Sequence, residues 1–208
     1  MILIGQYDSP FVRRVGIALS LYGLAFTHRP WSVMGETERI AALNPLVRVP
    51  TLLLDDGEVL VDSVTILDHL DTLVPEAARL VPSGGPERRA ALRLAALAMG
   101  AAEKAVSLFY ELRFHPAPAE SWVARCRMQI LGTLAALEHE RAARPGPFWF
   151  GDTFGHADIA LGCALRFIAE AHPGLVAAGS LPALAAQVAA MEALPVFRAV
   201  EQPFIPPA

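Results

Sequence analysis

Residues 7–15 read YDSPFVRRV and follow the short apolar run MILIG at the start of the chain. The apolar run is typical of a short buried strand. Ser9 followed by Pro10 is typical of a helix start, because a serine side chain can accept a backbone N–H there and proline lacks only a donor that the first helical position does not need. The stretch therefore predicts a strand, a tight turn and a helix that ends at Gly23. It leaves two interpretations of Ser9 open: a helix cap only, or a reactive hydroxyl at the mouth of a site.

The rest of the first third continues to alternate between strand and helix signals. Residues 25–32 predict a second strand, residues 35–44 predict a short helix, and residues 63–74 have apolar side chains at helical spacing. Asp56-Gly57 between two apolar runs is a strong hairpin signal. The expected order is β-α-β-α-β-β-α. It closes with a hairpin, and its first turn lacks Gly-x-Gly-x-x-Gly, so it predicts a thioredoxin-like α/β domain rather than a dinucleotide-binding domain.

The remaining chain contains a linker followed by helical patterns. Residues 76–86 include several prolines and glycines, which make a persistent helix or strand unfavourable there. We therefore expect a first domain at residues 1–75, a linker at residues 76–86 and a second domain at residues 87–208. Four segments of the second domain have helical periodicity and none has a convincing strand pattern. The predicted fold is a thioredoxin-like α/β N-terminal domain with an all-α C-terminal domain.

Composition excludes several classes of function. The chain has 208 residues, is 54% hydrophobic and has a formal net charge of -4, and it shows no clustered basic stripe for nucleic acid. Cys126 and Cys163 lie far apart and have no histidine at zinc spacing, so neither a disulfide framework nor a metal site is expected. The N-terminus lacks a signal-peptide pattern, and the longest uncharged run, residues 171–191, is interrupted by prolines and glycines. We expect a cytoplasmic protein that binds neither nucleic acid nor a membrane.

Two further segments place candidate binding groups in the same domain as Ser9. Val49-Pro50 directly precedes a predicted strand, where an X-Pro bond can be cis and the backbone of Val49 can pair with an extended ligand. Asp62 and Ser63 precede the third predicted helix, whose N-terminal amides would bind a carboxylate while the serine hydroxyl adds a donor. The alternative is that one of these two residues is an ordinary helix cap.

The segments DSPFVRRV, NPLVRVPTL and VDSVTILDHL, followed by a linker and an all-helical domain, resemble the cytosolic glutathione S-transferases over essentially the whole chain. The first segment is most similar to bacterial members whose strand-to-helix turn reads Ser-Pro-Phe or Ser-Pro-Tyr. The resemblance implies a homodimer in which the glutathione thiolate attacks a small hydrophobic electrophile. Glutathione would be the co-substrate.

The resemblance also implies a role for individual residues. The Ser9 hydroxyl would stabilise the thiolate, Val49 would pair with the cysteinyl backbone of glutathione, and Asp62 and Ser63 would hold its γ-glutamyl end. Arg48 would meet the glycyl carboxylate. The full set expected to bind glutathione is Phe11, Arg48, Val49, Pro50, Asp62 and Ser63.

The hydroxyl of Tyr7 is the alternative hydrogen-bond donor to the thiolate, because other classes of the family use a tyrosine on the first strand. Alternation along a strand would point Tyr7 and Ser9 to the same face. The Ser-Pro-Phe context favours Ser9. Aromatic and basic groups would also suit a pocket for a flat or anionic hydrophobic compound, although aromatic residues at helical spacing are also typical of a core. The expected pocket residues are Tyr7, Trp31, Phe109, Tyr110 and Arg113.

Two functions remain open at this point. The first is a glutathione transferase. The alternative is a non-catalytic glutathione-binding carrier or regulatory scaffold of the same fold. A Cys-based reductase or a glutathione-dependent isomerase is disfavoured because the turn at Ser9 contains no cysteine.

Asp158 is expected to serve folding instead of catalysis, because it lies three residues after Gly155 in the position of a capping-box acid.

Overall fold

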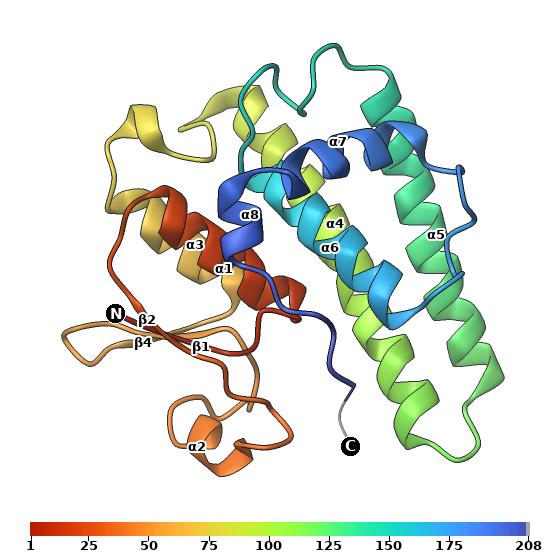
Figure 1. The fold of residues 1–208 in the computed structure, drawn as a ribbon, viewed down its shortest axis with the longest axis horizontal. Coiled ribbons are helices and arrows are strands. Elements are labelled where there is room, and N and C mark those ends of the chain that lie inside the picture. The colour runs from red at the N-terminus through yellow and green to blue at the C-terminus, as the bar shows by residue number, and fades with distance from the viewer. Residues whose placement is uncertain (207–208) are drawn as a thin grey trace. The chain divides into compact units, whose positions relative to one another are not determined.

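The strand signals of the first third form a four-stranded mixed sheet (Figure 1). The computed structural model describes residues 1–206, which divide into two units: Met1–Ser83 with the chain from Leu194 onward, and Gly84–Ala193. The strand order is β2-β1-β3-β4, in which β1 is parallel to β2 and antiparallel to β3, and β3 is antiparallel to β4. The strands are β1 (Ile2–Ile4), β2 (Thr27–Arg29), β3 (Thr51–Leu53) and β4 (Val59–Val61).

The helices of the first unit confirm the predicted order β-α-β-α-β-β-α. Apolar residues of α1 and α3 pack with Leu3 and Leu52 of the sheet into one buried cluster. Burial of these side chains is the main stabilising contribution to the unit. The elements are α1 (Pro10–Leu21), α2 (Thr37–Ala41), α3 (Ser63–Thr72), the 3₁₀ turn η1 (Glu76–Ala78) and a short C-terminal helix α8 (Pro195–Ala199).

Two glycines mark the ends of elements as the sequence predicts. Gly23 follows α1 with φ 65° and Gly57 lies in the β3–β4 hairpin with φ 92°. Positive φ is unfavourable for other residues and free for glycine. In the hairpin, Leu54 N–H donates to the Glu58 carbonyl at 2.9 Å, which closes the turn that Asp56-Gly57 predicts.

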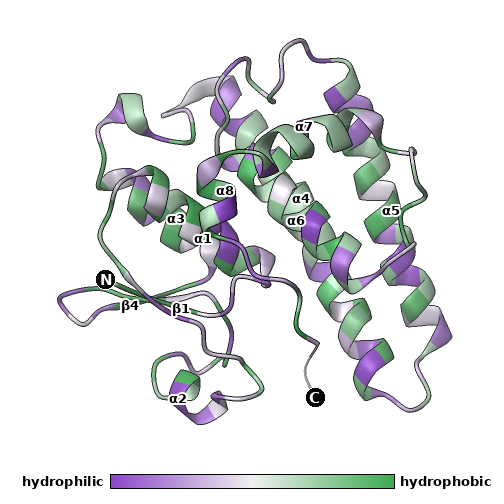
Figure 2. Cartoon of the chain, viewed as in Figure 1, coloured by the Kyte–Doolittle hydropathy of each residue, from purple (hydrophilic) through white to green (hydrophobic). Residues whose placement is uncertain are grey.

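The second unit consists of four long helices, as expected for an all-α domain. Figure 2 shows hydrophobic and hydrophilic residues interspersed along α4 and α5. On α4 the buried side includes many alanines, and small side chains allow neighbouring helices to approach closely. The helices are α4 (Gly85–Phe114), α5 (Glu120–Ala142), α6 (His156–Ala171) and α7 (Pro182–Glu192). Within residues 1–206, none of the helices combines the length and apolar character needed to cross a membrane.

The chain from Leu194 onward does not follow the expected domain division. We expected the helical domain to extend to residue 208, whereas the chain from Leu194 onward groups with the first unit. The reason is a buried arginine on α1: the Arg13 side chain donates to the carbonyls of Val200 and Phe197 at 2.8 and 3.0 Å. Helix α4 also begins at Gly85, inside the linker expected at residues 76–86.

The hydrogen bonds of Asp158 confirm its expected role in folding. Its carboxylate accepts hydrogen bonds from the Gly155 N–H at the start of α6, from the Trp149 N–H and from the Gln187 side chain, at 2.9, 2.9 and 2.8 Å. The residue is 1% exposed. Burial raises the pKa of Asp158, while the backbone N–H donors of Gly155 and Trp149 act to lower it. One carboxylate thus joins the α6 start, the preceding loop and α7.

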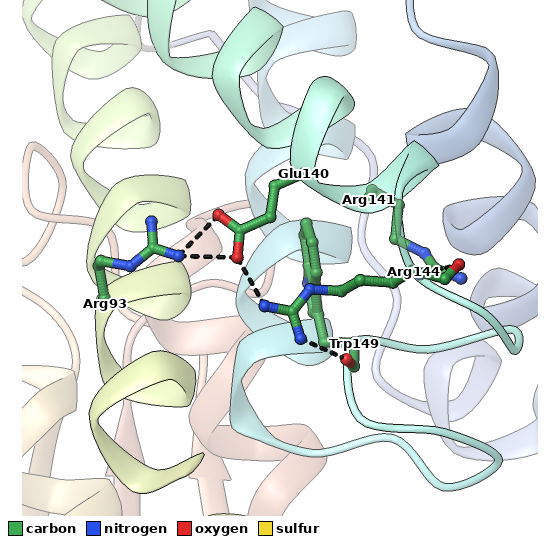
Figure 3. Close-up of polar contacts among 5 residues, drawn as sticks. All are labelled: Arg93, Glu140, Arg141, Arg144 and Trp149. Carbon is green, nitrogen blue, oxygen red and sulfur yellow. Dashed lines mark hydrogen bonds and ion pairs between the residues drawn. The ribbon is translucent and has the colours of Figure 1, made fainter. Parts of the chain in front are cut away.

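A charged cluster fixes the same loop to α4 and α5 (Figure 3). Glu140 accepts from Arg93 on both carboxylate oxygens, at 2.7 and 2.6 Å, and from Arg144 at 2.6 Å. Arg144 also donates to the Trp149 carbonyl at 3.0 Å and lies over its ring. Hydrogen bonds to Arg93 hold the pKa of Glu140 below its usual value, opposed by partial burial.

The pKa of Glu140 predicts a pH-dependent effect on stability. A carboxyl group whose folded pKa is lowered contributes stability that is present above its unfolded pKa of about 4.3 and is lost as pH falls through the folded pKa. Glu140→Gln is therefore expected to lower the free energy of unfolding by about 1 kcal/mol at neutral pH, with a smaller difference in acid. Urea unfolding across pH measures it, with Glu103→Gln, an exposed site on α4, as control. A difference independent of pH would contradict the assignment.

Candidate active site

Ser9 lies at the N-terminal end of α1 in the conformation of a helix cap, yet its side chain does not cap the helix. Its backbone has φ -70° and ψ 123°, and the hydroxyl makes no capping hydrogen bond. The turn is held by backbone bonds, from the Ser9 N–H to the Gln6 carbonyl at 3.2 Å and from the Arg13 N–H to the Ser9 carbonyl at 2.9 Å. The half-buried hydroxyl is thus available to a ligand at the positive end of a helix.

Tyr7 is positioned differently from the expectation. Strand β1 ends at Ile4, so residues 7–9 lie in a turn and strand alternation does not relate Tyr7 to Ser9. The Tyr7 ring stacks on the His28 ring with centroids 3.8 Å apart, and it packs so closely on α1 that a Cβ at Gly16 would lie 2.6 Å from it. Burial raises the pKa of Tyr7 to about 12. The ring is therefore part of the packing between the sheet and α1.

The segment before β3 presents the backbone of Val49. The Val49-Pro50 peptide bond is cis. Among residues 1–206, the N–H and C=O of Val49 find no hydrogen-bond partner, so both are available to an extended ligand. Gly5 brings this segment against the β1–α1 connection, since a Cβ at Gly5 would lie 2.8 Å from the Val49 Cβ and 2.5 Å from the Val12 side chain. Arg48 beside it has an exposed side chain.

Asn44 supports this segment and was not singled out from the sequence. Its buried side-chain amide donates to the Arg48 carbonyl at 2.9 Å and to the Thr51 hydroxyl at 3.1 Å, and its carbonyl accepts the Leu46 N–H at 3.0 Å. One side chain thus holds the chain on both sides of Val49. Asn44-Pro45 alone is an ordinary turn signal, so the sequence did not distinguish this role.

Asp62 and Ser63 lie at the start of α3 and have different environments. Asp62 is the exposed N-cap, with φ 67°, and one carboxylate oxygen accepts the Val64 N–H at 2.8 Å. A positive φ at a non-glycine residue costs free energy and is commonly found at ligand sites. Ser63 is buried, and its hydroxyl oxygen accepts a hydrogen bond from the side chain of Arg14 at 2.6 Å. Arg14 on α1 is a contributor that the sequence pattern did not reveal.

The remaining expected residues fall in three places. Phe11 is half-buried on α1, and Trp31 is half-buried after β2, with the guanidinium groups of Arg29 and Arg39 over its ring. The expected pocket residues of the second unit, Phe109, Tyr110 and Arg113, are near the C-terminal end of α4.

These α4 residues form an aromatic cluster within their own unit. The Phe109 ring contacts those of Tyr110 and His172 at centroid distances of 6.1 and 6.4 Å. Tyr110 contacts Phe114, and Arg113 lies over the Phe114 ring. Tyr110 and Phe114 are 38% and 40% exposed, which leaves apolar surface for a ligand. No group of His, Cys, Asp or Glu side chains within the described residues could hold a metal ion.

Family models match both parts of the chain. Residues 3–78 match the model described as "Glutathione S-transferase, N-terminal domain", and residues 120–200 match "Glutathione S-transferase, C-terminal domain". The chain belongs to the glutathione S-transferase family. The N-terminal match spans the turn at Ser9, the cis bond at Pro50 and the helix start at Ser63.

Individual family members are similar over most of the chain. The uncharacterized GST-like protein YibF of Escherichia coli strain K12 is 30% identical over 81% of this chain and 82% of its own length. A glutathione S-transferase from Methylobacterium radiotolerans JCM 2831, solved in complex with glutathione sulfonate, is 29% identical with a TM-score of 0.89, over 100% of this chain and 98% of that one. A glutathione transferase family member from Pseudomonas fluorescens Pf-5, solved with bound glutathione, is 33% identical with a TM-score of 0.84, over 98% and 99%.

Proposed function

We propose that this enzyme of the glutathione S-transferase family binds glutathione as its co-substrate in the first unit, and that the Ser9 hydroxyl stabilises the thiolate. The observation that carries the proposal is the state of Ser9: it stands at the N-terminus of α1, half-buried, with a hydroxyl that caps nothing. A family relative and neighbour of similar fold, from Pseudomonas fluorescens, holds glutathione. The thiolate would then attack an electrophilic carbon.

The energy that such a site must supply is modest. A thiol with a pKa of about 8.5 is only a few per cent ionised near neutral pH. Lowering its pKa by about two units requires about 2.7 kcal/mol in favour of the anion. A hydrogen bond to a charged group contributes about 1.5–3 kcal/mol and a helix N-terminus about 0.3–1 kcal/mol. The Ser9 hydroxyl together with the α1 N-terminus is therefore sufficient, and no general base is required.

The other groups of the first unit would bind the peptide part of glutathione. The free N–H and C=O of Val49 suit the cysteinyl backbone, and Pro50 fixes the chain beside them. Asp62 uses one oxygen as N-cap and retains the other for the ligand amine. The α3 N-terminus with Ser63 favours the γ-glutamyl carboxylate. Arg48 and Phe11 would line the same ligand.

The second substrate is proposed to be a small hydrophobic electrophile. Support comes from exposed aromatic surface at Tyr110 and Phe114, with Arg113 over one ring. Phe109 on the same helix, and Tyr7 and Trp31 in the first unit, each stay a prediction from the sequence. Such chemistry would serve detoxification. Family resemblance supports a homodimer and a cytoplasmic location, and size-exclusion chromatography with light scattering tests the dimer.

Conjugation assays distinguish the transferase from the alternative carrier. We expect a saturable, enzyme-dependent rate when glutathione is combined with an activated aryl halide. Glutathione binding without turnover on a panel of electrophiles would favour a non-catalytic carrier of the same fold. Failure to bind glutathione would contradict both functions.

Asp62→Asn is expected to weaken glutathione binding about tenfold without changing stability. Asparagine and aspartate are equally good N-caps, so the bond to the Val64 N–H survives. The variant removes only the charge proposed to pair with the ligand amine, and a charge-assisted hydrogen bond contributes about 1.5–3 kcal/mol. Calorimetric titration measures the dissociation constant and thermal unfolding measures stability. Asp56→Asn in the β3–β4 turn is the matched control, and an unchanged affinity for Asp62→Asn would leave Asp62 as a cap alone.

A further inference from the structure

The far end of the chain is bonded to the turn that carries Ser9. The two residues directly before Ser9 are hydrogen-bonded to residues 200–206, here called the C-terminal segment. The Tyr7 N–H donates to the side-chain carbonyl oxygen of Gln202 at 3.0 Å, and the Ile205 N–H donates to the Asp8 carboxylate at 3.1 Å. Figure 1 shows the C-terminal chain running from α8 past the N-terminal end of α1.

Helix α8 and the start of the C-terminal segment are both bonded to α1. Arg13, 2% exposed, donates to the carbonyls of Phe197 and Val200 and lies over the Phe197 ring at 5.4 Å. A Cβ at Gly16 would lie 3.0 Å from the Val200 side chain, so α1 and the segment pack closely there. Because the segment is held against α1, it can restrain the turn residues to which it is hydrogen-bonded.

The Gln202 oxygen accepts a backbone donor of the turn. The turn lies between β1 and α1, and its backbone is closed by the Ser9 N–H bond to Gln6 at 3.2 Å. The Tyr7 N–H points to a side chain, and without the Gln202 oxygen this half-buried donor would be left unsatisfied, which is costly. A hydroxyl that stabilises a thiolate must be held within a few tenths of an ångström to be effective.

We infer that Gln202 and Asp8 are positioning residues of the thiol site: they fix the Tyr7–Asp8 turn, and through it the Ser9 hydroxyl, from the C-terminal segment. The inference rests on the proposed role of Ser9. It makes the first unit's site depend on residues nearly two hundred positions away in the chain.

Gln202→Leu tests the inference, because it keeps side-chain size and removes the acceptor of the Tyr7 N–H. We expect the pKa of the bound glutathione thiol to rise by about one unit and kcat near neutral pH to fall about threefold, with KM for glutathione changed less than about twofold. Arg198→Ala, an exposed side chain on α8, is the control and should match the parent protein. A structural defect alone would change unfolding without this division between kcat and KM. If Gln202→Leu does not fold, Asp8→Leu removes the second contact and carries the same expectation.

The double variant Ser9→Ala/Gln202→Leu separates this inference from the proposed function. If Gln202 acts through Ser9, the second change adds little to the thiol pKa of Ser9→Ala. Full additivity, or an unchanged pKa in Gln202→Leu while Ser9→Ala raises it, would overturn the positioning role and leave the role of Ser9 intact. An unchanged pKa in Ser9→Ala would overturn both.

Discussion

Ser9→Ala is expected to raise the pKa of the bound glutathione thiol by about two units and to lower the conjugation rate near neutral pH roughly 10- to 100-fold. The reason is the loss of the one hydroxyl that lies at the N-terminus of α1 without an intramolecular capping bond. Because the side chain caps nothing, the same substitution should change the free energy of unfolding by less than about 0.5 kcal/mol, whereas loss of a true serine cap costs about 1 kcal/mol.

The two interpretations of Ser9 therefore predict opposite results. A cap would lose stability and keep the rate, and a reactive hydroxyl would lose the rate and keep stability. Steady-state conjugation kinetics across pH and urea unfolding of the same preparations measure both quantities. If Tyr7→Phe, and not Ser9→Ala, raises the thiol pKa, the donor is Tyr7 and the assignment is wrong.

Asp158→Ala is expected to lower the free energy of unfolding by about 3–5 kcal/mol. The substitution removes one buried carboxylate and leaves three donors without their acceptor: the N–H groups of Trp149 and Gly155 and the amide of Gln187. Each buried unsatisfied donor costs about 1–3 kcal/mol, and the three losses are not fully additive because they share one acceptor.

Urea unfolding measures this loss directly, with Asp152→Ala as the matched control. Asp152 is an exposed aspartate in the same loop, so its removal should change stability by less than about 0.5 kcal/mol. A loss below about 1 kcal/mol for Asp158→Ala would mean that the three donors find other partners. The loop and the α6 start would then not depend on this carboxylate.

Local signals account for most of what the sequence predicted of the fold. The turn at Asp56-Gly57 and the helix end at Gly23 depend on backbone conformations that neighbouring residues determine. Strand β1 is shorter than its apolar pattern suggested, because the chain turns after Ile4. Helix α8 has five residues, too few for periodicity to identify.

Long-range partners account for what the sequence did not predict. Arg13 and Arg14 occur together in a helical segment, a pattern that indicates a solvated face, yet both are buried. Their partners, the Val200 carbonyl and the Ser63 hydroxyl, lie 187 and 49 residues away. The supporting role of Asn44 is equally a product of tertiary contacts. No local pattern contains such information, and these contacts hold the site together.

Titration of the parent protein with glutathione, followed by ultraviolet absorbance of the thiolate across pH, is the direct test of thiolate stabilisation. We expect saturable binding and a bound thiol that titrates about two units below its usual pKa of about 8.5. A bound thiol that titrates at its usual pKa would contradict thiolate stabilisation at Ser9, and the absence of binding would contradict the glutathione site itself.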